Sequence, residues 1–66
     1  MSDVRIVLKD VIRNRGFNQS AIARKANMKP QTLCDILQLR RRLEASEMFA
    51  LCDAMEIDYS ELRPRN

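Results

Sequence analysis

The sequence predicts a single all-α domain, on the grounds of its length, its composition and the spacing of its apolar residues. The chain has 66 residues, which suffice for one small domain with an economical core. Helix-forming residues are plentiful, whereas glycine occurs once and tryptophan and histidine do not occur. Apolar residues recur at helical intervals of three and four. We therefore expect one compact domain over residues 1–66, with five helices and no sheet.

Capping and turn residues set the bounds of the first two expected helices. Asp3 is a suitable N-cap for the first helix, and Gly16 suits the left-handed residue that follows its end. Asn18 is a suitable N-cap for a second helix that begins at Gln19. Asn27 tolerates a positive φ better than other non-glycine residues, so we expect a sharp turn there.

The second half of the chain predicts three further helices. Pro30 suits the first turn of a helix that runs to about Gln38. The apolar stripe of the fourth helix consists of Ala45, Met48, Leu51, Cys52 and Met55. Asp58 and Glu61 have the spacing of a capping box for a short fifth helix, which Pro64 would stop.

Several classes of function are disfavoured by composition. Cys34 and Cys52 lie in helical patterns, which favours free thiols in a reducing cytosol, and without histidine a zinc site is not expected. No apolar run is long enough to span a membrane, and no signal-peptide pattern opens the chain, so we expect a cytoplasmic protein. The sequence has neither paired carboxylates in a pocket-forming context nor a phosphate-binding glycine loop. We therefore expect no enzyme, no cofactor and no small-molecule substrate.

Charge is distributed unevenly along the chain, whose net charge is +3. Residues 1–42 contain ten Lys/Arg and three Asp/Glu, a net charge of +7, whereas residues 43–66 contain two and six, a net charge of −4. A basic region in so small a chain favours a polyanionic partner, most often nucleic acid. The alternative is an ordinary solvated helix face.

The stretch from Gln19 to Gln38, QSAIARKANMKPQTLCDILQ, is suited to two short helices that cross steeply. Such a crossing needs small or apolar contact residues and a turn residue that accepts an unusual φ. The residues of these kinds are Ile22, Ala23, Ala26, Asn27, Met28, Leu33 and Ile36. The pattern resembles the helix-turn-helix of the Cro and phage-repressor family of DNA-binding proteins.

This resemblance covers nearly the whole chain, from the helix before GFNQSAIA to the terminal LCDAMEIDYSEL. It implies a lambda-repressor-like domain and a bacterial or phage transcription regulator that binds operator DNA, usually as a dimer. Two positions where relatives often have glycine hold Asn27 and Leu39. Many relatives also have a buried Arg–Glu pair where this chain has Ile12 and Leu37. Replacing both charges together with apolar residues can be neutral or favourable, so we interpret this chain as a variant of the fold.

One side of the third expected helix is a candidate surface for reading bases. At about 100° per residue, its polar residues lie opposite its apolar ones. The candidate base-reading residues are Gln31, Cys34, Asp35 and Gln38. Gln31 has the amide geometry for adenine, and Asp35 can accept from the amino group of cytosine. Simple solvation is the alternative for both, and Cys34 is expected to be a groove-facing contact rather than a redox switch.

Other polar residues are candidates for contacts with the DNA backbone, which position a protein without reading sequence. These are Gln19, Lys29, Thr32, Arg40, Arg41 and Arg42. Gln19 is included because relatives use an amide there to hold a phosphate. Four further basic residues are Arg13, Arg15, Arg24 and Lys25. They either extend this set of backbone contacts or are ordinary surface charges.

A second surface is expected to join two copies of the chain. Tyr59 is the main candidate contact, with Ile57 and Phe49, although Tyr59 could instead cover the edge of the core. The leading hypothesis is a homodimeric repressor that binds a palindromic site in double-stranded DNA. The alternative is a protein-interaction module, such as an antitoxin-like partner protein with the same fold.

Overall fold

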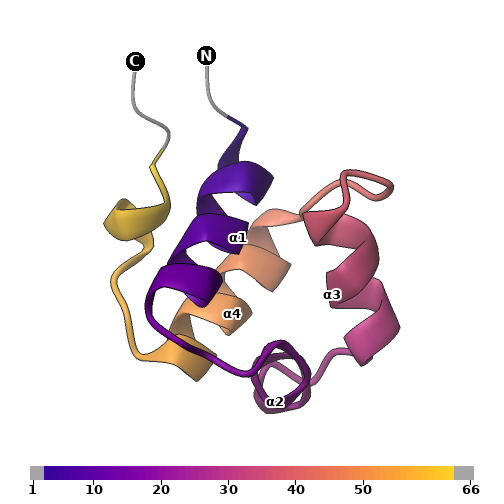
Figure 1. Ribbon diagram of the computed structural model, residues 1–66, viewed down its shortest axis with the longest axis horizontal. Coiled ribbons are helices and arrows are strands. Elements are labelled where there is room, and N and C mark those ends of the chain that lie inside the picture. Colours follow the sequence, from indigo (N-terminus) through magenta and orange to yellow (C-terminus); the bar gives the residue numbers. More distant parts are fainter. Residues whose placement is uncertain (1–2, 64–66) are drawn as a thin grey trace.

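Four α-helices and one short 3-10 helix make up the computed structural model, which describes residues 3–63 (Figure 1). The elements are α1 (Val4–Asn14), α2 (Gln19–Lys25), α3 (Pro30–Leu37), α4 (Ala45–Met55) and the 3-10 helix η1 (Tyr59–Leu62). The described part of the chain contains no strand. The expectation of a compact all-α domain is therefore confirmed.

The predicted helix starts are confirmed by their hydrogen bonds. A carboxylate oxygen of Asp3 accepts from the backbone N–H of Arg5 at 2.8 Å, and the side-chain oxygen of Asn18 accepts from that of Ala21 at 3.0 Å. Pro30 is in the first turn of α3, where its missing N–H leaves no bond unmade. Local capping chemistry thus sets where these helices begin.

Each of the four α-helices is followed by a residue with a positive φ. These residues are Gly16 (71°), Asn27 (60°), Leu39 (65°) and Glu56 (56°). In every case the N–H of the next residue donates to the carbonyl five residues before it, as in the Schellman motif. The four bonds are Phe17 N to Ile12 O (3.0 Å), Met28 N to Ala23 O (2.8 Å), Arg40 N to Asp35 O (2.8 Å) and Ile57 N to Cys52 O (3.0 Å). The turn at Asn27 was predicted, whereas the left-handed conformations of Leu39 and Glu56 were not.

The fifth predicted helix is a single 3-10 turn, so the described residues form four α-helices and this turn where five helices were expected. Asp58 caps it as expected, because its carboxylate accepts from Ser60 N at 3.0 Å. Glu61, however, forms an ion pair with Arg15 at the end of α1. Leu62 is fully buried and holds the turn against the core. Pro64, which was expected to stop this helix, lies outside the described residues.

The core is made by one side of every helix. Its buried residues are Leu8, Ile12, Ile22, Ala23, Leu33, Ile36, Leu37, Leu51, Cys52, Met55 and Leu62. Ile12 and Leu37 lie in this core, and no charged side chain is buried among residues 3–63. Cys34 and Cys52 are free thiols, as predicted.

α2 and α3 cross steeply (Figure 1). In this view α2 is seen end-on while α3 is seen from its side. Ala23 is fully buried in α2, which packs against both α3 and α4. The chain leaves α2 through Asn27, and the partly buried Met28 packs on the core. This arrangement holds α3 at the edge of the molecule with one side outward.

Among the helices of residues 3–63, none has the length and apolar character that crossing a lipid bilayer requires.

Replacing Glu56 by glycine should stabilise the domain. An L-residue in the left-handed conformation is strained by its Cβ, and the exposed Glu56 has this conformation after α4. We expect Glu56→Gly to raise the free energy of unfolding by about 0.5–1 kcal/mol in urea titrations. Glu56→Ala is the control and should give no such gain, because it keeps the Cβ. Equal effects of the two substitutions would contradict this explanation.

Candidate nucleic-acid interface

The outward side of α3 is polar, and its inward side is buried. Leu33 and Ile36 are 0% exposed and Leu37 is 4% exposed. On the other side Gln31 and Gln38 are exposed, and Cys34 and Asp35 are partly exposed. The structure therefore brings three of the predicted base-reading residues, Gln31, Cys34 and Asp35, onto the accessible side of α3, and the fourth, Gln38, is the exposed residue that caps its end.

Three polar side chains on this side are bonded to one another. The Oδ1 atom of Asp35 accepts from Nε2 of Gln31 at 3.0 Å and from Nε of Arg40 at 3.2 Å. The Nη2 atom of Arg40 is 3.1 Å from the same oxygen and 4.0 Å from the sulfur of Cys34. Asp35 is therefore already an acceptor for two neighbouring side chains, and its negative charge is paired.

The turn at Leu39 explains why Arg40 reaches Asp35. Because Leu39 is left-handed, the chain reverses and the N–H of Arg40 donates to the carbonyl of Asp35 at 2.8 Å. Backbone and side chain of Arg40 therefore contact the same residue. This double attachment limits the directions in which the guanidinium can point.

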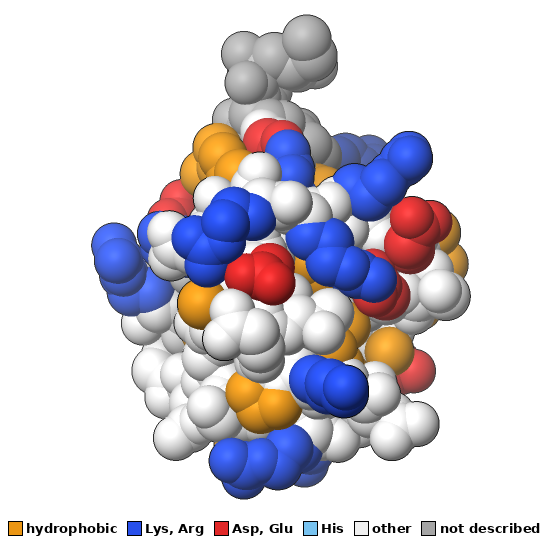
Figure 2. Space-filling model, turned by 90° about the vertical axis from the view of Figure 1, so that its right-hand side faces the viewer, with side chains coloured by type: hydrophobic (Ala, Val, Ile, Leu, Met, Phe, Trp, Pro, Cys, Tyr) orange, Lys and Arg blue, Asp and Glu red, His pale blue; other side chains and the backbone are white. Residues whose placement is uncertain are grey.

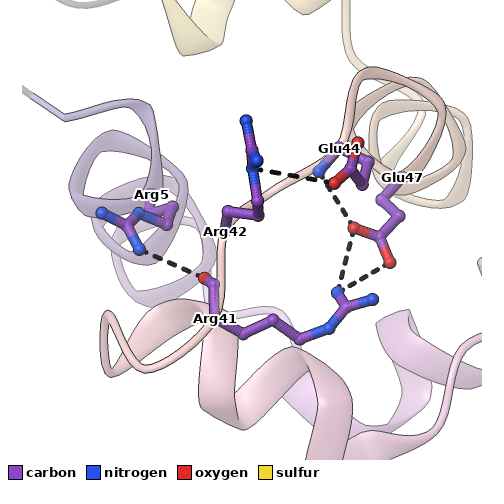
Figure 3. A network of polar contacts seen from close by, with 5 residues as sticks. All are labelled: Arg5, Arg41, Arg42, Glu44 and Glu47. Atoms are coloured by element: carbon purple, nitrogen blue, oxygen red, sulfur yellow. Dashed lines mark hydrogen bonds and ion pairs between the residues drawn. The ribbon is translucent and has the colours of Figure 1, made fainter.

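Arg41 is occupied by contacts within the protein (Figure 3). Its Nη1 atom donates to both carboxylate oxygens of Glu47, at 3.0 and 2.8 Å, and its carbonyl accepts from Nη1 of Arg5 at 3.1 Å. These bonds tie the loop between α3 and α4 to the start of α4 and to α1. Arg41 is therefore suited to holding the loop in place.

Arg42 is the most accessible of the three consecutive arginines. Its side chain is 88% exposed, and its only described ion pair, to Glu44, is long at 3.7 Å. In Figure 3 it extends in a different direction from Arg41. The sequence suggested three equivalent phosphate contacts, but the structure gives the three arginines different surroundings.

Glu47 organises the start of α4. Its Oε1 atom accepts from Glu44 N at 3.0 Å in addition to Arg41, which is one half of a capping box. Partial burial alone would raise the pKa of the Glu47 carboxyl, but the hydrogen bonds from the Glu44 backbone and from Arg41 outweigh it and hold that pKa below its ordinary value. The carboxylate form of Glu47 thus stabilises the loop and the helix together.

A shallow groove of about 520 Å³ separates the start of α3 from the start of α4. Its lining residues are Ala26, Asn27, Met28, Lys29, Thr32, Arg41, Ser46, Glu47 and Ala50. Lys29 and Thr32, two predicted backbone contacts, are thus at the N-terminal edge of α3. Gln19, another such candidate, is the first residue of α2 and is partly exposed.

The molecular face on which α3 lies carries many cationic side chains (Figure 2). Lys and Arg side chains are spread over this face, and hydrophobic and acidic side chains lie between some of them. Arg15 does not extend this face, because it pairs with Glu61 in η1, at the opposite end of the molecule from α3 (Figure 1). Arg13, Arg24 and Lys25 are exposed.

The candidate dimer residues form a small aromatic patch. The rings of Phe49 and Tyr59 meet edge to face with centroids 5.7 Å apart, and 49% and 53% of these residues remain exposed. Ile57 is partly buried between α4 and η1. Because η1 and α3 lie at opposite ends of the molecule in Figure 1, a contact through Tyr59 would leave the outward side of α3 accessible.

Sequence reasoning missed the residues that hold the α3–α4 loop. Glu44 and Glu47 have capping-box spacing before an apolar helix, and this signal could have indicated Glu47. Nothing local predicts the bond from Arg5 to the carbonyl of Arg41, which joins residues 36 positions apart.

No three His, Cys, Asp or Glu side chains within residues 3–63 are arranged to hold a metal ion. No protein-family model matches the chain, and no curated protein or solved structure matches it either. We therefore infer function from the geometry of α3 and its surroundings.

The bonds of Glu47 should make stability depend on pH. Because folding lowers the pKa of Glu47, its contribution is fully present above its unfolded value and is lost as pH falls through the folded one. We expect the free energy of unfolding of the wild type to fall between about pH 5 and pH 3, and Glu47→Gln to show a smaller fall. Urea titrations across this pH range measure the free energy of unfolding of both proteins.

Arg41→Ala provides the matched control for this pH dependence. It removes the main charged partner of Glu47 and should also flatten the profile, with little further change when both substitutions are combined. Parallel profiles for wild type and Glu47→Gln would contradict the assignment.

Proposed function

We propose that this chain is a sequence-specific DNA-binding protein in which α2 and α3 form a helix-turn-helix and α3 enters the major groove. One observation carries the proposal: α3 is buried along one side and presents hydrogen-bonding side chains along the other, with cationic side chains next to it. A helix of this kind fits the major groove, where base edges present distinct patterns of donors and acceptors.

The surroundings of α3 support a duplex rather than a single strand as the ligand. Single-stranded nucleic acid is usually bound by stacking on exposed aromatic rings. The described part of α3 and of the loop after it has no aromatic residue, and Phe49 and Tyr59 lie on α4 and η1. Amide and guanidinium groups instead suit base edges and phosphates of a duplex.

The proposed biological role is transcriptional repression from a palindromic operator. A domain of this size buries too little surface to specify a long site alone, and two copies related by a twofold axis would double the contact. Occupying a promoter is sufficient to repress it. The lambda-repressor-like assignment is part of this proposal and is supported by the helix order and the steep crossing of α2 and α3.

Selection of binding sites from random duplex DNA tests the proposal. We expect enrichment of an inverted repeat with half-sites about one helical turn, roughly 34 Å, apart. The second candidate, a protein-interaction module, is favoured by the exposed Phe49–Tyr59 pair. Absence of enrichment, together with a stable complex with another protein, would favour this second function.

Arg42→Ala should weaken binding to all DNA sequences alike. A cation that neutralises one phosphate contributes about 0.9 to the slope of log affinity against log salt, so losing Arg42 should reduce that slope by about 1. Fluorescence anisotropy at several salt concentrations measures it. Arg15→Ala is the control, since Arg15 pairs with Glu61 away from α3 and should leave the slope unchanged. An unchanged slope for Arg42→Ala would remove Arg42 from the backbone contacts.

Gln31→Ala should change sequence preference. Gln31 is exposed in the first turn of α3, and a bidentate amide contact to adenine contributes about 1–3 kcal/mol of discrimination. The substitution should therefore relax preference at one base pair of each half-site on a panel of single-base operator variants at fixed salt. A uniform loss across the panel would instead make Gln31 a backbone contact.

Tyr59→Ala should disrupt pairing of two copies on DNA. The half-exposed ring is a suitable interface anchor, so its loss should weaken binding to a full operator more than to one half-site. Footprinting and sedimentation measure these effects. Tyr59→Phe keeps the ring and should behave as the wild type. Tight full-site binding by Tyr59→Ala would exclude this surface from the dimer.

A further inference from the structure

We propose that Gln31, Asp35 and Arg40 form one recognition unit, in which Asp35 positions the other two to read an adenine and a nearby guanine. The inference rests on the proposed function, because it names the bases that the outward side of α3 would bind. It also gives Asp35 a role other than direct contact with cytosine, and makes Arg40 a base contact rather than a backbone contact.

A single oxygen atom joins the unit. Oδ1 of Asp35 accepts from Gln31 Nε2 at 3.0 Å and lies 3.2 and 3.1 Å from Nε and Nη2 of Arg40. Donors bonded to the same oxygen can be no more than about 6 Å apart. Stacked bases are spaced about 3.4 Å apart along a strand, so the two side chains fit bases that are no more than two base-pair steps apart.

Gln31 keeps the groups that adenine requires. Its amide nitrogen has two hydrogens, one of which is directed to Asp35. The second hydrogen can donate to N7 of adenine while Oε1 accepts from N6. The bond to Asp35 also identifies which end of the amide is the donor, so the orientation of the amide is fixed before DNA binds. Less side-chain entropy is then lost on binding.

Arg40 keeps the groups that guanine requires. The edge formed by Nε and Nη2 faces Asp35, and Nη2 also makes a weak contact at 4.0 Å with the sulfur of Cys34. Nη1 makes neither contact, and a base that displaces the weak sulfur contact meets the terminal N–H groups of both Nη1 and Nη2. Two parallel donors of this kind match O6 and N7 of guanine. The side chain is 60% exposed, and its backbone N–H is held by the carbonyl of Asp35, which directs it along α3.

Electrostatics also favour a positioning role for Asp35 over direct contact with a base. A lone carboxylate on a surface that faces DNA would be repelled by the phosphates. Here the carboxylate accepts from two donors and is paired with a guanidinium, so it has a structural reason to be on α3. Its charge also offsets that of Arg40, which favours base contacts over simple attraction to phosphate.

Site selection repeated with four variants tests the unit. Wild type should enrich an adenine and a guanine no more than two steps apart. Gln31→Ala should lose only the adenine preference and Arg40→Ala only the guanine preference. Asp35→Ala should weaken both preferences, by roughly fivefold or more each, while its affinity for random DNA stays equal or rises. Asp35→Asn keeps an acceptor for Gln31 without the charge and should retain the adenine preference better than the guanine preference. Circular dichroism establishes that each variant is folded.

Three results would overturn the inference while leaving the proposed function intact. In the first, Arg40→Ala weakens every sequence equally, so Arg40 is a phosphate contact. In the second, Asp35→Ala changes one base pair while the preferences that depend on Gln31 and Arg40 persist, so Asp35 reads a base directly. In the third, folded Asp35→Ala selects the wild-type site. If wild type itself enriches no sequence, the proposed function and this inference both fail.

Discussion

The packing of α2 against α3 and α4 determines how the rest of the domain is arranged. Ala23 is fully buried, and its carbonyl accepts from Met28 N at 2.8 Å, so the same residue supports the crossing and the turn that follows. Interiors are packed densely enough that a larger side chain here would force the helices apart. Leu33 and Ile36 then bury one side of α3 completely, and its polar side must face outward. The candidate interface is a consequence of this packing.

Helix ends contribute to the interface as much as helix surfaces do. Left-handed Leu39 is strained by its Cβ, by about 1–2 kcal/mol, and the bond from Arg40 N to Asp35 O helps to offset that strain. The turn brings Arg40 back onto Asp35 and passes the chain to Arg41, which is held by Glu47. The single backbone reversal at Leu39 therefore gives two neighbouring arginines different places: Arg40 lies beside the polar side of α3, and Arg41 holds the loop.

Much of the fold could be predicted from the sequence because it depends on neighbouring residues. Asp3, Asn18 and Asn27 act within a few positions of themselves, and apolar spacing identifies the buried side of each helix. The pairing of Glu61 in η1 with Arg15 was not predictable in this way, because the two residues are 46 positions apart. Likewise, neither Leu39 nor Glu56 has a side chain that favours a left-handed conformation.

The candidate site was predictable as a set of residues but not as a set of contacts. Helical geometry alone places Gln31 and Asp35 on one side of α3, whereas the three arginines look alike in sequence and differ only in their tertiary surroundings. Titrating ¹⁵N-labelled protein with duplex DNA and following amide chemical shifts tests most directly whether α3 is the DNA-binding surface. We expect the largest shifts within residues 29–42, including the side-chain amide of Gln31. Largest shifts at Phe49 and Tyr59, with α3 unchanged, would contradict it.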